Sequence, residues 1–164
     1  MRLYGVTGWK NAGKTTLMER LVREITARGI SVSTVKHAHH DAEVDHPGRD
    51  SFRHRAAGAR EVLLSSPARW ALMHELRGAQ EPALDELLAR LSPVDLVLIE
   101  GYKREGHPKI EAYRHVIGRP PLAEGNATIR AVAADVVPPR LDVPKFGLDD
   151  ISAIATFVLQ EVGL

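Results

Sequence analysis

One stretch near the start of the chain combines the residue types that bind phosphate. Gly8-Trp9-Lys10-Asn11-Ala12-Gly13-Lys14-Thr15 fits the pattern G-x-x-x-x-G-K-[ST] at every position. Glycines let a backbone curl until several N–H groups converge on one anion, and the helix that follows points its positive end at the same place. We expect Lys14 to reach the β- and γ-phosphates, the Thr15 hydroxyl to ligate Mg²⁺, and Thr16 to lie near the α-phosphate. The predicted nucleotide-binding residues here are Gly8, Asn11, Ala12, Gly13, Lys14, Thr15 and Thr16.

A second chemical feature is a carboxylate at the end of an apolar run. Leu96-Val97-Leu98-Ile99 is typical of a strand buried on both faces of a parallel sheet, and Glu100 follows it directly. Open α/β sheets bind ligands at the carboxyl ends of their strands, where a carboxylate can hold Mg²⁺ or its waters. We predict that Glu100 helps to hold the metal and is catalytic together with Lys14; the alternative is that it caps the next turn. Asp95, at the other end of the run, is expected to be structural.

A polar segment rich in histidine follows the second predicted strand and can face the same site. In Lys36-His37-Ala38-His39-His40-Asp41, we predict that Asp41 contacts Mg²⁺ directly or through water and that Lys36 neutralises phosphate. The clustered histidines lack any cysteine beside them and are weak evidence for a transition-metal site.

Arginines gather on the short helix predicted over residues 50–57. Arg49, Arg53 and Arg55 concentrate positive charge, and we predict that Arg49 and Arg53 bind a phosphorylated ligand. A solvated helix face explains the same cluster equally well. Three further basic side chains are expected to extend a cationic rim after the acidic strand: Lys103, Arg104 and Lys109.

The elements that must position these residues alternate between strands and helices. Apolar residues at three- and four-residue spacing predict amphipathic helices over about 17–25, 84–91 and 151–159. Short β-branched or apolar runs predict strands at about 3–6, 30–36, 61–64, 70–73, 94–99, 110–113 and 128–133. This order predicts an α/β fold with a mainly parallel sheet.

Composition excludes several classes of protein. The chain has 164 residues, of which 44% are hydrophobic and 26% charged, so we predict one globular domain over residues 1–164. A net charge of +1 disfavours binding of a nucleic acid polymer. The absence of cysteine excludes disulfides and thiol catalysis. No apolar run approaches the roughly 20 residues that cross a membrane, so we expect a cytoplasmic protein that makes no membrane contact.

Four stretches in order resemble the molybdopterin-guanine dinucleotide biosynthesis adaptor family, MobB. They are GWKNAGKTTL (8–17), KHAHHDAEVDHPGRDSFRHRAAGA (36–59), DLVLIEGYK with HPKIE (95–103 and 107–111), and AVAADV (131–136). The phosphate loop alone would indicate only a broad NTPase superfamily. The second stretch, joined to the VLIEGYK and PKIE pair, is far more specific.

The resemblance implies a P-loop NTPase-like three-layer sandwich that binds GTP with Mg²⁺ and hydrolyses GTP slowly to GDP and phosphate. It also implies a homodimer and partnership with the guanylyltransferase that attaches GMP to molybdopterin; molybdopterin itself is a second candidate ligand. Carried over by position, the phosphate roles fall on Gly13, Lys14, Thr15 and Thr16, and the acidic roles on Asp41 and Glu100.

The guanine-reading sequence N-K-x-D of ordinary GTPases is absent. A carboxylate must still accept from the guanine N1–H and N2–H₂ groups, and Asp135 at the end of a late predicted strand is our candidate. The alternative is that Asp135 caps a turn. Exposed aromatic side chains at Trp70 and Tyr102 are candidate dimer contacts, although both fit a core equally well.

Two other functions use the same phosphate loop. One is an autonomous small-molecule kinase, in which the arginine-rich helix binds the acceptor. Kinases usually carry arginines on a lid, and segment 118–126 has only Arg119. The other is a non-enzymatic adaptor that a nucleotide merely stabilises.

Overall fold

A computed structural model describes residues 1–38, 44–138 and 141–164 of the chain. The chain forms two compact units, one made of Met1–Ala38 with Ser92–Leu164 and the other of His39–Leu91. The first unit contains the phosphate loop and the acidic strand. The prediction of a single domain over 1–164 stays a prediction.

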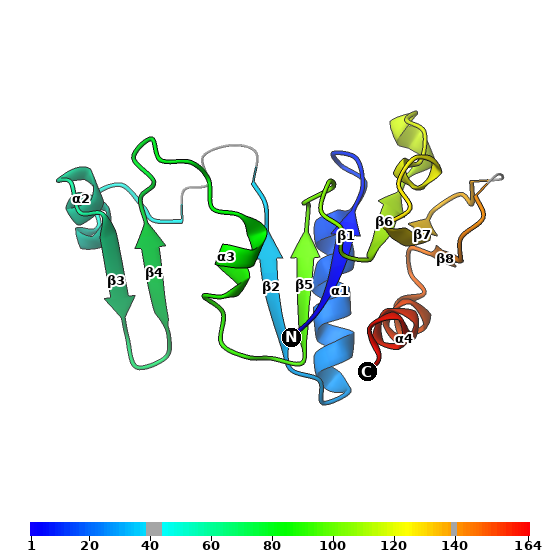
Figure 1. Cartoon of the computed structure of the whole chain (residues 1–164), viewed down its shortest axis with the longest axis horizontal. Coiled ribbons are helices and arrows are strands. Elements are labelled where there is room, and N and C mark those ends of the chain that lie inside the picture. Colours follow the sequence, from blue (N-terminus) through cyan, green and yellow to red (C-terminus); the bar gives the residue numbers. More distant parts are fainter. Residues whose placement is uncertain (39–43, 139–140) are drawn as a thin grey trace. The chain divides into compact units, whose positions relative to one another are not determined.

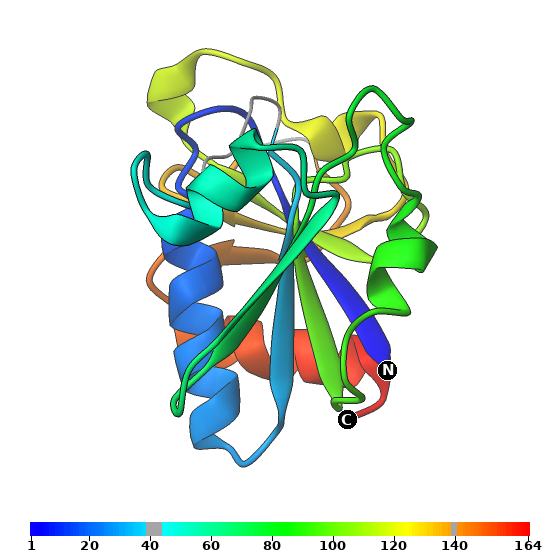
Figure 2. The same ribbon diagram turned by 90° about the vertical axis from the view of Figure 1, so that its left-hand side faces the viewer.

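The first unit is built on a parallel sheet with the strand order β2-β5-β1-β6-β7-β8 (Figure 1). Figure 2 shows how these strands splay across one another, as the twist of a parallel sheet requires. The strands are β1 (Arg2–Thr7), β2 (Val32–Lys36), β5 (Leu96–Glu100), β6 (Lys109–Tyr113), β7 (Ile129–Ala134) and β8 (Lys145–Gly147). Five were predicted. The sixth, β8, has only three residues and no apolar pattern long enough to indicate a strand.

Helices α1 (Lys14–Ala27) and α4 (Ile151–Val162) pack against each other and against β1. Alternate residues of β1, Tyr4 and Val6, face the helices and are fully buried. The helix residues buried in the same core are Leu17, Leu21, Ile25, Ile154, Ala155 and Val158. The predicted α/β fold with a mainly parallel sheet is therefore confirmed.

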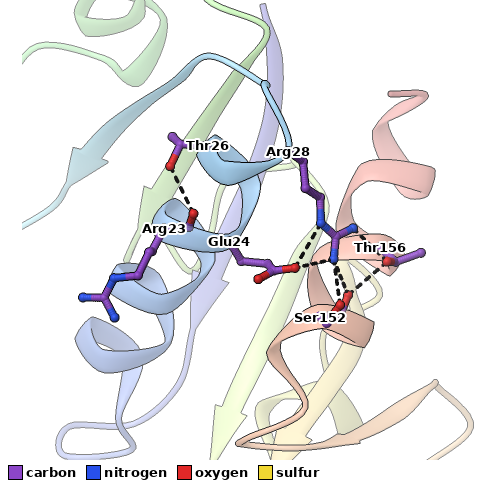
Figure 3. A network of polar contacts seen from close by, with 6 residues as sticks. All are labelled: Arg23, Glu24, Thr26, Arg28, Ser152 and Thr156. Carbon is purple, nitrogen blue, oxygen red and sulfur yellow. Dashed lines mark hydrogen bonds and ion pairs between the residues drawn. The ribbon is translucent and has the colours of Figure 1, made fainter.

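A polar clamp fastens the end of α1 to the start of α4 (Figure 3). The Arg28 guanidinium donates to Oε1 of Glu24 at 2.7 Å from Nη2 and 3.1 Å from Nε. It also donates to the Ser152 carbonyl at 2.9 Å and to the Thr156 hydroxyl at 2.9 Å. One side chain thus bridges the end of α1 and the start of α4.

The segment after β6 contains two short 3₁₀ turns, η1 (His115–Ile117) and η2 (Leu122–Glu124). Buried Glu111 of β6 accepts hydrogen bonds from the Leu122 and Ala123 N–H groups, both at 2.9 Å. The segment is therefore tied to the sheet through a carboxylate inside the unit.

The second unit contains α2 (Asp50–Ala56), the antiparallel hairpin of β3 (Glu61–Ser65) and β4 (Trp70–His74), and α3 (Leu84–Leu88). Arg55 is used within it, because its guanidinium contacts Glu75 at 2.6 Å and Asp45 at 3.6 Å. Its charge is therefore paired with two carboxylates of the same unit and holds α2 to the end of the hairpin. Among the described helices, none is both long and apolar enough to cross a membrane.

Candidate functional site

The phosphate loop leaves β1 at Thr7 and turns through residues with unusual backbone angles. Gly8 has φ +143°, and a Cβ there would come within 2.4 Å of the Ala112 carbonyl oxygen. Gly13 has φ +93°, and Asn11 adopts φ 66°, a value that Asn tolerates better than most residues. Glycine at position 8 is therefore required by both angle and space, which explains the first position of the motif.

Helix α1 begins at Lys14 with an N-terminus arranged for an anion. No side chain caps the helix, and its first turn carries no acidic residue. The free N–H groups of a first helical turn attract negative charge, most strongly where no side chain already satisfies them. The Lys14 ammonium donates to the Trp9 carbonyl at 2.9 Å, which holds it over the loop. Burial lowers the pKa of Lys14, and the nearby charges of Lys103 and Lys36 lower it further against the opposing effect of Glu100.

Thr15 and Glu100 meet although 85 residues separate them in the sequence. The Thr15 hydroxyl donates to Oε1 of Glu100 at 3.0 Å, and the Lys36 ammonium lies 3.6 Å from the same oxygen. Mg²⁺ with oxygen ligands at about 2.0–2.1 Å places neighbouring ligands about 3 Å apart, so the two oxygens fit one coordination shell. The parallel register explains the meeting, because β1, which leads into the loop, pairs directly with β5.

Three predicted site residues are not among the described residues of the first unit. Asp41 lies outside the described residues. Arg49 and Arg53 belong to the second unit, where Arg53 is exposed and 3.9 Å from Asp50. Within the described ranges, no group of three or more His, Cys, Asp or Glu side chains can hold a metal. Mg²⁺ usually keeps several waters and binds one or two carboxylates beside substrate phosphates, so a site of that kind would need no such cluster.

A pocket of about 320 Å³ lies beside the loop, lined by Gly13, Thr16, Arg20 and Asp135 among others. Asp135 directly follows β7 and accepts hydrogen bonds from the His115 N–H at 2.9 Å and the Val136 N–H at 2.8 Å. These bonds lower the pKa of Asp135 and keep it ionised. Both bonds use Oδ1, so Asp135 caps a turn and still presents a carboxylate to the pocket.

Arg114 is a candidate site residue that carries no sequence motif. It follows β6, and its guanidinium Nε would lie 3.5 Å from a Cβ built on Gly13. It lines the same pocket as Asp135, and its guanidinium makes no hydrogen bond or ion pair with any described residue. The one signal in the sequence was its position just after a strand that ends beside the phosphate loop.

The His107-Pro108-Lys109-Ile110-Glu111 stretch is structural. Lys109 is fully buried, and its ammonium donates to the carbonyls of Glu105 and His107 and to the Thr128 hydroxyl. The prediction that Lys109 extends a cationic rim is therefore wrong, because backbone oxygens already surround the charge. The side chains of His107 and Lys109 cover Gly5, where an added Cβ would come within 2.7 Å of each.

His107 should make the stability of the protein depend on pH. Burial, with the nearby Lys109 charge, lowers the pKa of His107 from 6.5 to about 4. The unfolded chain therefore binds this proton more readily, so stability is complete above pH 6.5 and falls as pH drops toward about 4. When the pH drops from 7 to 5, the unfolding free energy of His107→Gln should fall by about 1–2 kcal/mol less than that of the wild type.

Urea denaturation at the two pH values measures this difference. His54→Gln is the matched control, because His54 is exposed on α2. Equal pH dependence in the wild type and His107→Gln would show that the buried imidazole contributes nothing.

Comparisons with known proteins agree with this architecture. The family model described as "Molybdopterin guanine dinucleotide synthesis protein B" matches residues 3–135. The chain is 40% identical over 161 residues to the molybdopterin-guanine dinucleotide biosynthesis adapter protein of Escherichia coli, covering 96% of this chain and 91% of that one. It is 40% identical over 158 residues to the Haemophilus influenzae adapter protein, covering 95% and 86%.

A solved structure shows the same fold. The crystal structure of a MobB protein homolog from Bacillus stearothermophilus superimposes with a TM-score of 0.73 at 30% identity and covers 99% of both chains. The P-loop NTPase-like α/β fold expected from the resemblance is thereby confirmed. The extent and identity of these matches mean that the chain belongs to the molybdopterin-guanine dinucleotide synthesis protein B family, MobB.

Proposed function

We propose that this member of a family of molybdopterin-guanine dinucleotide biosynthesis adapters acts by binding GTP with Mg²⁺ and has weak Mg²⁺-dependent GTPase activity. The observation that carries the proposal is the pairing of Thr15 with Glu100 at 3.0 Å, beside the uncapped first turn of α1. N–H groups for phosphate, a lysine and a carboxylate that can hold a metal then lie together at one edge of the sheet.

Each residue has a definite task in this proposal. Backbone N–H groups of the loop hold the phosphates, Lys14 neutralises their charge, and Thr15 with Glu100 holds Mg²⁺, which screens charge between phosphate oxygens. The 320 Å³ pocket takes the nucleoside, and Asp135 accepts from the guanine edge. Arg114 contacts the phosphate nearest Gly13, since its guanidinium lies against that residue.

Slow hydrolysis follows from what surrounds the phosphate loop. Fast GTPases orient water with a glutamine, and this chain has glutamine only at positions 80 and 160. Gln160 lies in the last turn of α4, and Gln80 belongs to the second unit. Slow turnover suits a carrier or switch that a partner completes.

The partner in this proposal is the guanylyltransferase that attaches GMP to molybdopterin, and molybdopterin is a second ligand. We further propose a homodimer. Trp70 supports it, because this side chain is 67% exposed on a two-stranded hairpin. Tyr102 offers less support, since its ring lies 4.8 Å from that of His37.

Binding and turnover measurements test the proposal. GTP should bind at least 10-fold more tightly than ATP, and GTP turnover should be slow alone and change when the guanylyltransferase and molybdopterin are added. The mass of the sample in solution should be twice 18.0 kDa. Equal affinity for the two nucleotides would contradict guanine recognition. Rapid phosphate transfer to a small acceptor would favour the kinase, and binding without any turnover would favour the nucleotide-stabilised adaptor.

A further inference from the structure

A second pocket, of about 470 Å³, lies beside the phosphate loop. We call it the Trp9 pocket; its walls include Trp9, Lys103, Pro120, Pro121, Leu122 and Asn126. It shares no lining residue with the pocket that contains Asp135. Trp9, which lines it, is a residue of the phosphate loop. The Trp9 pocket therefore borders the phosphate loop.

Trp9 is part of both the phosphate loop and the Trp9 pocket. Its carbonyl oxygen accepts from the Lys14 ammonium at 2.9 Å, while its indole N–H donates to the Pro120 carbonyl at 2.8 Å. The second bond joins the phosphate loop to segment 118–126, which forms the opposite wall of the pocket. A molecule in the Trp9 pocket would thus touch a residue that also holds the phosphate-binding lysine.

The walls of the pocket are held in place by the fold. The Asn126 side-chain amide donates to the Lys103 carbonyl at 3.1 Å, and its oxygen accepts from the Thr128 N–H at 3.0 Å. The buried Glu111 carboxylate binds the Leu122 N–H at 2.9 Å. Because these contacts already order the pocket walls, a ligand that binds there has less conformational entropy of the protein to remove.

The surface of the pocket joins a flat apolar wall to positive charge. The indole ring, two prolines and Leu122 suit a planar heterocycle. The Lys103 ammonium lies 4.8 Å and the Arg119 guanidinium 5.6 Å from the centre of the indole ring. Neither cation forms an ion pair with a described residue. Lys103 and Glu124 line the pocket, whereas Arg119 reaches it through its contact with the Trp9 ring. An anionic group is therefore favoured only beside Trp9, where both cations lie.

We propose that the Trp9 pocket binds a planar heteroaromatic molecule that carries a phosphate group. Its ring packs against Trp9 and the prolines, and Lys103 and Arg119 hold its phosphate. The proposal rests on the proposed function, to which it adds a site for the second ligand next to the bound GTP. A pterin phosphate and a guanine nucleotide share this chemistry, and the experiment separates them.

Fluorescence of Trp9 reports binding directly. The chain has two tryptophans, so Trp70→Phe leaves Trp9 as the only one. The probes are 6-hydroxymethylpterin phosphate, GMP and inorganic phosphate, each titrated with and without saturating GDP and Mg²⁺. We expect saturable quenching by the pterin phosphate in both conditions. Lys103→Ala should raise its Kd at least 10-fold, whereas Arg104→Ala, which changes an exposed neighbour outside the pocket, should not.

The possible results separate this proposal from the proposed function. If GDP binds but the pterin phosphate causes no saturable quenching, the Trp9 pocket proposal is overturned and the nucleotide site stands. If GDP fails to bind while the pterin phosphate still responds to Lys103→Ala, the nucleotide site fails and the pocket stands. Equal Kd values for inorganic phosphate and the pterin phosphate would overturn the proposal that the pocket binds the heteroaromatic ring of its ligand. Quenching by GMP in the GDP-saturated protein would support the pocket with a nucleotide as its ligand.

Discussion

Replacing Lys14 by alanine should reduce the affinity for GTP at least 100-fold and leave the fold intact. The ammonium is positioned by the Trp9 carbonyl at 2.9 Å over an N-terminal helix turn that lacks a cap. Charge-assisted hydrogen bonds to phosphate contribute about 1.5–3 kcal/mol each, and a 100-fold loss corresponds to about 2.7 kcal/mol. Alanine removes a charge that burial already disfavours, so the unfolding free energy should not fall.

The measurement is calorimetric titration with GTP and Mg²⁺, accompanied by thermal unfolding of each variant. Lys10→Ala is the matched control, because Lys10 is an exposed lysine of the same loop. Its affinity should change less than 3-fold. Unchanged affinity in Lys14→Ala would refute the assignment of the whole phosphate site.

Glu100→Gln should remove the dependence of GTP affinity on Mg²⁺. In the wild type, Mg²⁺ should increase affinity at least 10-fold, because the carboxylate and the Thr15 hydroxyl lie 3.0 Å apart, as two ligands of one ion do. In Glu100→Gln this increase should fall below 3-fold. Without the metal, the variant should bind GTP as tightly as the wild type or more tightly, since a negative charge near the phosphates has been removed.

This opposite response with and without Mg²⁺ distinguishes a metal role from general damage to the site. Glu105→Gln is the control, because Glu105 is an exposed carboxylate after the same strand. Titrations in EDTA and in Mg²⁺ measure the GTP affinity of the wild type and of Glu100→Gln without and with the metal. Equal losses in both conditions would mean that Glu100 shapes the loop and does not serve the metal.

Local sequence patterns were sufficient to predict the features that depend on residues close together in the sequence. The motif from Gly8 to Thr15 identified the phosphate loop, because its backbone angles and helix start are set within eight residues. The apolar run before Glu100 predicted a buried strand with a carboxylate at its end, and β5 has that form. Asp95 was also interpreted correctly as structural, since it accepts from the Ser31 N–H and hydroxyl.

Charge patterns were less reliable, because a basic residue looks the same in the sequence whether it faces solvent, a ligand or a carbonyl. Lys109 was expected at a cationic rim and is fully buried among backbone oxygens. Arg55 was expected near a ligand and is paired with two carboxylates. Arg114 carried no motif and lies against Gly13. Which partner each cation finds depends on strand register and loop path, and these couple positions far apart in the chain.

The sequence by itself determined the phosphate loop, the acidic strand end, the alternation of strands and helices, and the resemblance to one family. Each of these depends on spacing within a short segment, where backbone geometry and hydrophobic period are local properties. Only the tertiary structure decided that Thr15 meets Glu100, that Arg114 and Asp135 share a pocket, and that Trp9 joins the loop to segment 118–126. Those meetings follow from the strand order β5-β1-β6-β7, which brings four separate strand ends to one edge of the sheet.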